Sequence, residues 1–280
     1  MSARPVSVPD WGERLRLFAL IVAALVMISP LLWMFGLSLK PNLELLRDTG
    51  SVIRAPWTLQ NYADVFGGSQ VFRWFLNSTI VALGTTVGVL TLSSLAGYGF
   101  SRLEFPGRNI VLMIVLFGLA VPEQSVIIPR HQMLAALDLH NTYPALMLPG
   151  LAAPFGVFLM TQYFRAIPRE LDEAAMLDGT SRFRIFWRVL LPLTLPAQAT
   201  LGIFTFLSAW NDYWWPMISA TNSEMFTLTV GVAATQQNFA QTNGLGFLMA
   251  QAVFASLPIL GVYILFQKHI VRAVAGTAVR

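Results

Sequence analysis

Long uncharged runs dominate the chain, and short segments that hold most of the charged residues separate them. The charge-free runs cover residues 17–39, 74–101, 141–164, 189–211 and 225–267, while residues 109–129 contain a single charge, Glu123. Each run is long enough for the roughly 20 apolar residues that cross a bilayer as an α-helix. The runs lack the strict alternation of membrane β-barrel strands. Because backbone groups in lipid must bond internally, the pattern predicts an all-α integral membrane protein.

Six transmembrane helices are expected within one membrane domain over residues 1–280. The spans are predicted at about residues 17–39, 75–100, 109–129, 143–164, 193–218 and 246–267. The last uncharged run is longer than one span needs, and its first part, "MFTLTVGVAATQQNFAQTNGLG", becomes polar, so we assign that part to an outside loop. The first span exceeds the apolar stretch of a signal peptide and no A-x-A cleavage site follows it, so we expect it to be retained.

Composition supports the membrane prediction. Of the 280 residues, 55% are hydrophobic and 11% are charged, whereas about a quarter of the residues in soluble domains are charged. The chain has no cysteine, which excludes disulfides and thiolate metal sites. The net charge of +4 could suggest a nucleic-acid partner, but in a membrane chain the placement of basic residues matters more.

Lysine and arginine are unevenly distributed between the two sides of the predicted membrane. With the N-terminus placed inside, the inner segments carry thirteen of the eighteen basic residues and the outer segments carry five. By the positive-inside rule, both termini are expected in the cytoplasm. The same rule places the loop of residues 165–192 on the cytoplasmic side.

That loop is the densest charge cluster of the chain, with five arginines and four acidic residues. Its first part predicts a helix of about ten residues. Pro168 suits the first helical position, and acidic residues follow it in the opening turns, where the helix dipole favours them. Gly179 is expected to end the helix in a left-handed conformation.

A second helix is predicted behind Thr180 or Ser181, either of which could cap it. Its apolar residues recur at three- and four-residue spacing and are expected on one face; they are Phe183, Phe186, Trp187 and Leu190. Arg184 and Arg188 lie one turn apart on another face, and Pro192 closes the helix.

The first helix is too short to be stable alone in water, so its exposed side is expected to meet a partner. The alternative is that the loop only anchors the topology, with the acidic residues present for solubility.

The loop resembles the EAA signature of the permease subunits of bacterial ABC importers, which reads E-A-A, three residues, G, nine residues, I-x-L-P. The matching residues are Glu173, Ala174, Ala175, Gly179, Leu191 and Pro192, and Val189 replaces the usual isoleucine. Further segments are similar to the carbohydrate importers of the maltose-permease type: "SLK" at 38–40, "NY" at 61–62, "NS" at 77–78, "AGYGFSRLEFPGRN" at 96–109, "LDLHNTYPALML" at 137–148, "AWNDYWWPMI" at 209–218 and "AGTAVR" at 275–280.

This resemblance implies a type I ABC importer permease fold and a division of labour. The short helix would be a coupling helix seated on a cytoplasmic ATPase subunit, which would bind the ATP and Mg²⁺, so that this chain carries no cofactor and is not an enzyme. The expected coupling residues are Glu173, Ala174, Ala175, Asp178, Gly179, Arg184 and Pro192. The implied partners are a second permease, two ATPase subunits, an extracytoplasmic solute-binding protein and a carbohydrate, with no nucleic acid. The implied location is the bacterial cytoplasmic membrane.

Two ionisable residues near membrane depth are candidates for the substrate path, because such residues normally face a cavity or a partner. Asp212 lies among Asn211, Tyr213 and Trp214, a mixture that suits the apolar faces and hydroxyl edges of sugars. The alternative is an aromatic belt at the outer interface. Glu123 lies between two prolines and could line a cavity or be a hydrated structural residue.

The resemblance also suggests that an outer loop near Gln236, Gln237 and Asn238 reaches into the docked binding protein. It implies as well that the partner permease holds much of the sugar.

Two other functional classes stay open on the sequence. An intramembrane enzyme would need paired catalytic residues such as H-E-x-x-H within the spans, and the sequence contains no such motif. A secondary transporter would show similar halves. The cargo stays open, with a mild preference for neutral sugars because the spans contain no obvious anion clamp.

Overall fold

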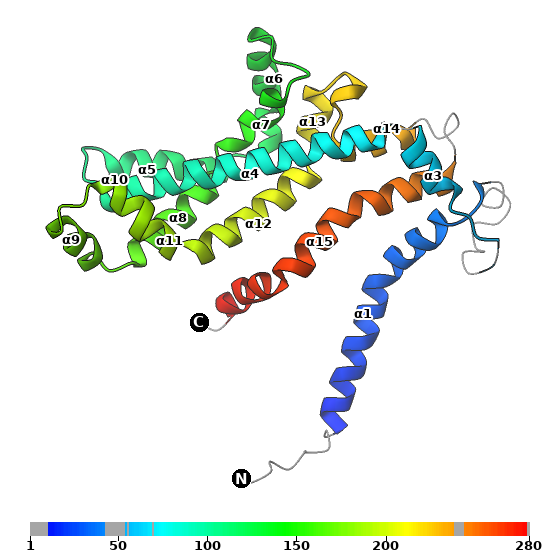
Figure 1. The fold of residues 1–280 in the computed structure, drawn as a ribbon, viewed down its shortest axis with the longest axis horizontal. Helices are drawn as coiled ribbons and strands as arrows, with labels where there is room; N and C mark the ends of the chain where they lie inside the picture. Colours follow the sequence, from blue (N-terminus) through cyan, green and yellow to red (C-terminus); the bar gives the residue numbers. More distant parts are fainter. Residues whose placement is uncertain (1–10, 43–53, 55, 69, 238–243, 279–280) are drawn as a thin grey trace. The chain divides into compact units, whose positions relative to one another are not determined.

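The computed structural model describes residues 11–42, 54, 56–68, 70–237 and 244–278, and every regular element among them is helical (Figure 1). The α-helices are α1 (Trp11–Ser38), α3 (Gln60–Gly67), α4 (Val71–Arg102), α5 (Arg108–Phe117), α6 (Ile127–Ala136), α7 (Tyr143–Leu151), α8 (Pro154–Ala166), α9 (Glu170–Leu177), α10 (Arg182–Ile185), α11 (Leu191–Leu193), α12 (Leu195–Asn211), α13 (Trp214–Ser219), α14 (Leu228–Gln237) and α15 (Leu245–Ala278). Short helical segments of other types are η1 (Gly118–Ala120), η2 (Glu123–Val126), the π-helix η3 (Phe186–Leu190) and η4 (Ser223–Met225).

Among the described residues, three helices are long and apolar enough to cross a membrane, in the segments Trp11–Ser38, Val71–Arg102 and Leu245–Gln267. Three bent pairs pass the same test together, which gives up to six spans if each pair is one span. The pairs are Arg108–Ala120 with Glu123–Ala136, bent by 102°, Tyr143–Leu151 with Pro154–Ala166, bent by 48°, and Arg182–Leu193 with Leu195–Asn211, bent by 76°.

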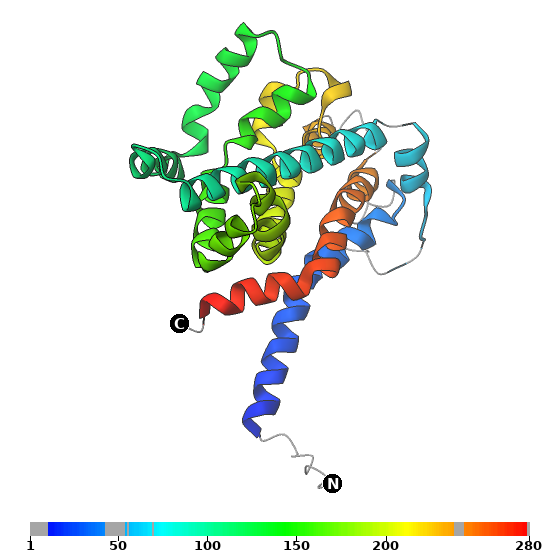
Figure 2. The same cartoon turned by 60° about the vertical axis from the view of Figure 1, so that its left-hand side comes forward.

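Three of the apolar runs contain bends and do not each form one continuous helix. Residues 109–129 are divided among α5, η1, η2 and α6, and in Figure 2 α6 turns away from α5. Val121 at the break is extended, with φ −84° and ψ 117°. This conformation follows from Pro122, because proline disfavours helical geometry in the residue before it. Similarly, the non-helical Ala152 and Ala153 precede Pro154.

The chain divides into two compact units, which are described separately. Unit 1 comprises Met1–Ser69 and Thr235–Phe254, and unit 2 comprises Gln70–Ala234 and Ala255–Arg280.

A polar joint lies in unit 1 between the end of α1, the start of α3 and the start of α15. Asn61 donates through Nδ2 to the carbonyl oxygens of Ser38 at 2.8 Å and Lys40 at 2.9 Å. The hydroxyl groups of Ser38 and Tyr62 lie 2.7 Å apart. The backbone N–H of Gly246 donates to Oδ1 of Asn42 at 2.7 Å. The joint therefore brings together the separate "SLK" and "NY" segments.

The α4 helix is the centre of unit 2, where it makes its most extensive contacts with α8, α12 and α7. The core around it holds the buried side chains of Val89, Met160, Phe164, Ile185, Phe186, Leu190, Ala197 and Leu201. Small residues let these helices approach closely, as is usual in membrane bundles. A Cβ atom on Gly97 of α4 would lie 2.7 Å from Met160 Cβ and 2.9 Å from the backbone nitrogen of Thr161. The α4–α8 contact therefore requires glycine at position 97.

Candidate functional site

The EAA segment, residues 165–192, contains the loop that resembles the EAA signature. Its first part folds into a short exposed helix, α9, that ends in a sharp turn. None of the eight residues of α9 is buried, and Leu177 is 89% exposed. Gly179 has φ +73°, its N–H donates to Met176 O at 3.0 Å, and the N–H of Thr180 donates to Ala175 O at 3.1 Å. These two bonds form a Schellman motif, which satisfies the last carbonyl groups of the helix. The left-handed conformation expected at Gly179 is therefore present.

Most of the side chains expected to contact an ATPase point out of the chain. Glu173, Ala174, Asp178 and Gly179 are exposed, and Ala175 is half-buried against the core of unit 2. Apolar side chains are exposed on the same helix, since Leu171 is 42% exposed and Met176 is 44% exposed. An exposed eight-residue helix that displays apolar side chains fits a docking role better than a solvated loop.

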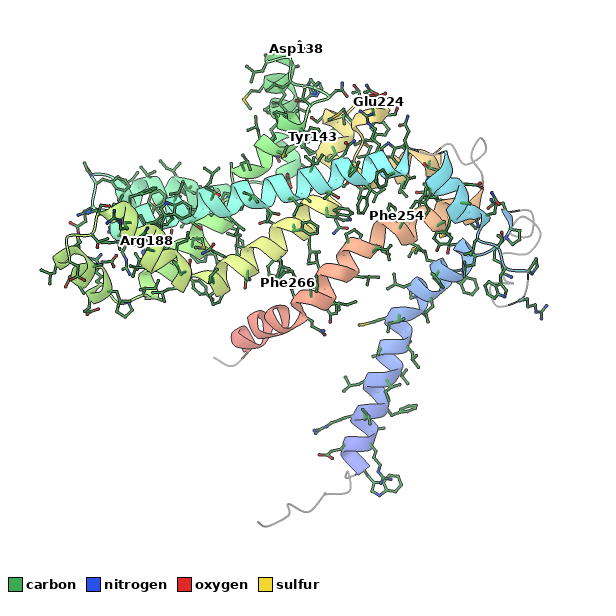
Figure 3. The ribbon with its side chains drawn as sticks, viewed as in Figure 1. Asp138, Tyr143, Arg188, Glu224, Phe254 and Phe266 are labelled. Atoms are coloured by element: carbon green, nitrogen blue, oxygen red, sulfur yellow. The ribbon has the colours of Figure 1, made fainter. Side chains whose placement is uncertain are left out.

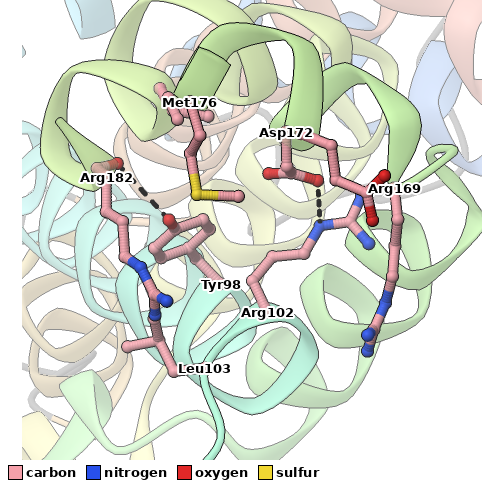
Figure 4. A pocket seen from close by; sticks show the side chains of 9 residues that line it. Tyr98, Arg102, Leu103, Arg169, Asp172, Met176 and Arg182 are labelled. Atoms are coloured by element: carbon pink, nitrogen blue, oxygen red, sulfur yellow. Dashed lines mark hydrogen bonds and ion pairs between the residues drawn. The ribbon is translucent and has the colours of Figure 1, made fainter. Parts of the chain in front are cut away.

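One acidic residue of α9 is directed inward, in a role that the sequence pattern did not indicate. Asp172 Oδ2 lies 3.0 Å from Nε of Arg102 at the end of α4, and the two side chains are only 13% and 6% exposed. Arg102 also donates to Ile167 O at 2.7 Å, ahead of α9. The ion pair lies at the edge of a cavity of about 110 Å³ whose lining includes Tyr98, Met176 and Arg182 (Figure 4). In the sequence, the only sign of this ion pair was Arg102 itself, at the end of the "AGYGFSR" segment.

The second helix of the EAA segment buries only some of the apolar side chains that were expected on one face, Phe183, Phe186, Trp187 and Leu190. Phe186 and Leu190 are buried, but Phe183 is 70% exposed and Trp187 is 47% exposed. The rings of Phe183 and Phe186 both contact the ring of Trp187, with centroids 6.2 Å and 5.3 Å apart. Phe186–Leu190 is a π-helix, whose wider turn shifts the side chains from the 3.6-residue period. Ser181 occupies the N-cap position, but its side chain makes no capping hydrogen bond.

The same segment presents its basic residues outward and joins α12 through a bend. Arg184 and Arg188 are exposed, as is Pro192. At the bend, Gln198 donates through Nε2 to Leu191 O and to Thr194 Oγ1, both at 2.9 Å. These bonds satisfy polar groups that the 76° bend leaves without regular helical partners.

The aromatic segment at 209–218 contains a break between α12 and α13. Asp212 lies at the break, where its Oδ1 is 3.5 Å from the N–H of Trp215 and its carbonyl accepts from Thr229 Oγ1 at 2.7 Å. Trp214 is 58% exposed and forms an edge contact with the ring of Tyr213 at 5.6 Å. The amide of Asn211 donates to Leu207 O within its own helix at 2.8 Å. The structure therefore brings Asp212, Tyr213 and Trp214 together at one helix break.

The other candidate residues lie in different settings. Glu123 is exposed in η2 and pairs with Arg130 at 3.2 Å. Gln236 is exposed in α14, so the expected outer loop includes a helix, to which Gln237 also belongs. Asn238 lies outside the described residues.

A polar cluster on unit 2 joins motif segments for which the sequence suggested no contact. Asn141 accepts through Oδ1 from the N–H groups of Thr221 and Asn222, both at 2.8 Å. Tyr143 donates to Oδ1 of Asn77 at 2.8 Å, and the amide of Asn77 donates to the Glu224 carbonyl at 2.8 Å. The "NS" and "LDLHNTYPALML" segments therefore meet at residues 221–226.

Comparison with known proteins agrees with this fold and its motifs. Residues 89–276 match the family described as "Binding-protein-dependent transport system inner membrane component". The chain is 35% identical to the arabinooligosaccharides transport system permease protein of Bacillus subtilis, over 92% of each chain. It is 34% identical to the diacetylchitobiose uptake system permease protein of Streptomyces coelicolor, over 91% of this chain and 85% of that protein.

Among solved structures, the fold matches a chain of a bacterial ABC transporter involved in the import of the acidic polysaccharide alginate. The TM-score is 0.79 at 23% identity, over 93% of this chain and 99% of that one. The fold is accordingly that of an ABC importer permease. By its sequence match over residues 89–276, the chain belongs to the inner membrane components of binding-protein-dependent transport systems.

Proposed function

We propose that this chain is one of two permease subunits of a carbohydrate ABC importer and that α9 is its docking helix for an ATPase subunit. The observation that carries the proposal is the exposed EAA helix with its Schellman turn at Gly179. In the assembly, Glu173 pairs with a basic group of the ATPase, and the apolar side chains of α9 enter a groove on it. The ATP and Mg²⁺ bind to two such ATPase subunits, and this chain supplies no catalytic residue.

The proposed orientation places α9 and both termini in the cytoplasm. The support is the excess of lysine and arginine in the segments that share a side with α9. The break at Asp212 then lies toward the outer face, where an extracytoplasmic binding protein delivers the solute. Residues 236–238 are proposed to approach that binding protein.

The proposed cargo is a sugar. The support is the class of solute named for the relatives, namely arabinooligosaccharides and diacetylchitobiose. The half-buried Asp212 and Tyr213 and the exposed Trp214 and Asn211 are the proposed contacts of this subunit with it. Glu123 is proposed to border the same path. If Trp214→Ala and Asp212→Ala both leave uptake kinetics unchanged, the solute takes another route.

The docking role is tested by uptake in cells that express the whole importer. Glu173→Lys is expected to abolish uptake and to stop the ATPase subunit from co-purifying, while the protein stays in the membrane. Glu104→Lys is the matched control, because Glu104 is an exposed acidic residue between α4 and α5 that undergoes the same change of charge. Normal uptake with Glu173→Lys would exclude the docking role. The cargo is identified by calorimetry of the importer's binding protein against a panel of sugars.

A further inference from the structure

An ion pair joins the proposed docking helix, α9, to α4, the 32-residue helix at the centre of unit 2. The side chains of Arg102 on α4 and Asp172 on α9 lie 3.0 Å apart and are 6% and 13% exposed, although neither residue is buried as a whole. Burying two charges costs desolvation, and well-packed apolar residues would hold two helices together at least as well. Unlike such residues, the Arg102–Asp172 ion pair joins α9 and α4 through two particular charged atoms, and Arg102 also donates a hydrogen bond to Ile167 O at 2.7 Å, ahead of α9.

The last turn of α4 also holds the second half of the EAA segment. Tyr98, one helical turn before Arg102, donates its hydroxyl proton to Arg182 O at 3.3 Å. Its ring contacts Phe186 with centroids 5.1 Å apart and Phe164 with centroids 6.0 Å apart. Figure 4 shows Tyr98 and Arg102 side by side, one directed to Arg182 and the other to Asp172. One turn of α4 is therefore bonded on both sides of the Gly179 turn.

The opposite end of α4 is bonded just as specifically. The indole N–H of Trp74 donates to Ser223 O at 2.8 Å. The amide of Asn77 donates to Glu224 O at 2.8 Å and to Phe226 O at 2.9 Å. The hydroxyl of Ser78 accepts from the N–H of Leu228 at 2.8 Å. These bonds attach the start of α4 to the segment 223–228, between α13 and α14.

Between these two ends, α4 is uninterrupted. It has 32 residues and no proline, so its length is about 48 Å at 1.5 Å per residue. Arg188 in the EAA segment and Glu224 lie toward opposite ends of the helix in Figure 3. The bent pairs of unit 2 could absorb a displacement at bends of 48° to 102°. The straight α4 has no such break.

We propose that Arg102, Asp172 and Tyr98 lock the docking helix onto α4, so that α4 carries a displacement of α9 directly to the segment 223–228. This inference rests on the proposed docking of an ATPase at α9. Arg102 and Asp172 are then positioning residues. The α4 helix transmits the movement that nucleotide binding causes in α9 to the opposite side of the membrane.

The first test measures solute transported per ATP hydrolysed by the reconstituted importer in liposomes. The double variant Arg102→Met with Asp172→Leu removes the ion pair but keeps the site filled. It is expected to co-purify with the ATPase subunits and to hydrolyse ATP, while the transport ratio falls at least about fivefold, the lower bound of common coupling strengths. Asp172→Glu is expected to retain most of the ratio. Arg165→Met, which removes an exposed arginine at the end of α8, is the matched control.

The second test measures a distance directly. The chain has no cysteine, so cysteines introduced at the exposed positions Glu170 on α9 and Phe72 at the start of α4 would carry the only two spin labels on this subunit. In the otherwise unmodified complex, their separation is expected to stay constant between nucleotide-free and ATP-bound states. In the double variant it is expected to change or broaden.

Two results would contradict the proposal that α4 transmits the displacement of α9. One is a native transport ratio in the double variant, and the other is a label separation that changes with nucleotide in the otherwise unmodified complex. If the double variant does not assemble, the label separation in the otherwise unmodified complex decides alone. Failure of the docking proposal is recognised separately, because Glu173→Lys would then leave ATPase association intact whatever happens at Arg102.

Discussion

The indole N–H of Trp215 donates to the carbonyl oxygen of Ala145 at 2.9 Å, although 70 residues separate the two along the chain. Ala145 lies four residues before Pro149 in α7, and proline has no N–H to complete that helical hydrogen bond. The side chain of Trp215 supplies the missing donor. Because Trp215 is 4% exposed and packs with Leu134 and Ala145, its position is explained by the helix it completes.

We expect Trp215→Phe to lower the free energy of unfolding by about 1–3 kcal/mol, because it leaves a buried carbonyl without a partner. Thermal unfolding of the purified complex in detergent would measure the change. Trp214→Phe, at the adjacent and 58% exposed position, should have little effect on stability. Equal losses for the two variants would contradict the role assigned to the Trp215 hydrogen bond.

The uncharged runs predicted the continuous helices α4 and α15, because hydropathy reports directly whether a segment can be surrounded by lipid. They could not locate the bends. Pro30 and Pro258 lie inside continuous helices, whereas Pro122 and Pro154 adjoin breaks. Proline alone therefore does not identify a break: within the continuous helix α1, the Val26 carbonyl that Pro30 leaves without a backbone donor accepts from the hydroxyl of Ser29 at 2.9 Å.

In the EAA segment, too, the sequence predicted local features but not those that depend on distant contacts. The turn at Gly179 was predictable because it depends on a few adjacent residues. The ion pair of Asp172 was not, since Arg102 lies 70 residues earlier, and the helix dipole alone already accounted for an acidic residue there. The π-helix at Phe186–Leu190 was also missed, because its register depends on packing against α4 and α8.

The close approach of α4 and α8 predicts opposite effects for two nearby glycines. A Cβ on Gly97 would lie within 3 Å of the Met160 backbone, so Gly97→Ala must separate the helices and should cost about 1–3 kcal/mol. Nothing lies within 4 Å of a Cβ on Gly99. Gly99→Ala should therefore be neutral or stabilise the helix by up to about 1 kcal/mol. Unfolding temperatures of the two variants in detergent would check the difference, and a shift of the same sign for both would contradict it.

The polar cluster around Asn141 predicts a graded series. Asn141 has φ +61°, and its Oδ1 accepts two backbone hydrogen bonds. Asn141→Gly keeps the conformation but loses these two bonds and the bond that the Asn141 amide donates to Thr221 Oγ1 at 3.0 Å, at about 0.5–1.5 kcal/mol each. Asn141→Ala adds the cost of a left-handed alanine, about 1–2 kcal/mol. Asp138 has φ +53°, so Asp138→Ala tests the conformational cost at a second site. Unfolding measurements should rank Asn141→Ala as the most destabilising of the three.

Substitutions of Gly179 can distinguish the effect of backbone conformation from the effect of charge at the proposed docking surface. A Cβ there would meet nothing within 4 Å, so the φ of +73° is the local constraint. Asparagine and aspartate tolerate this conformation, whereas alanine costs about 1–2 kcal/mol. Gly179→Asn should therefore keep most of the uptake, Gly179→Ala should reduce it, and Gly179→Asp should abolish it by adding a negative charge beside the acidic Asp178. Uptake assays with ATPase co-purification would measure the series. If Gly179→Asn is as inactive as Gly179→Asp, the loss is steric and the electrostatic explanation is wrong.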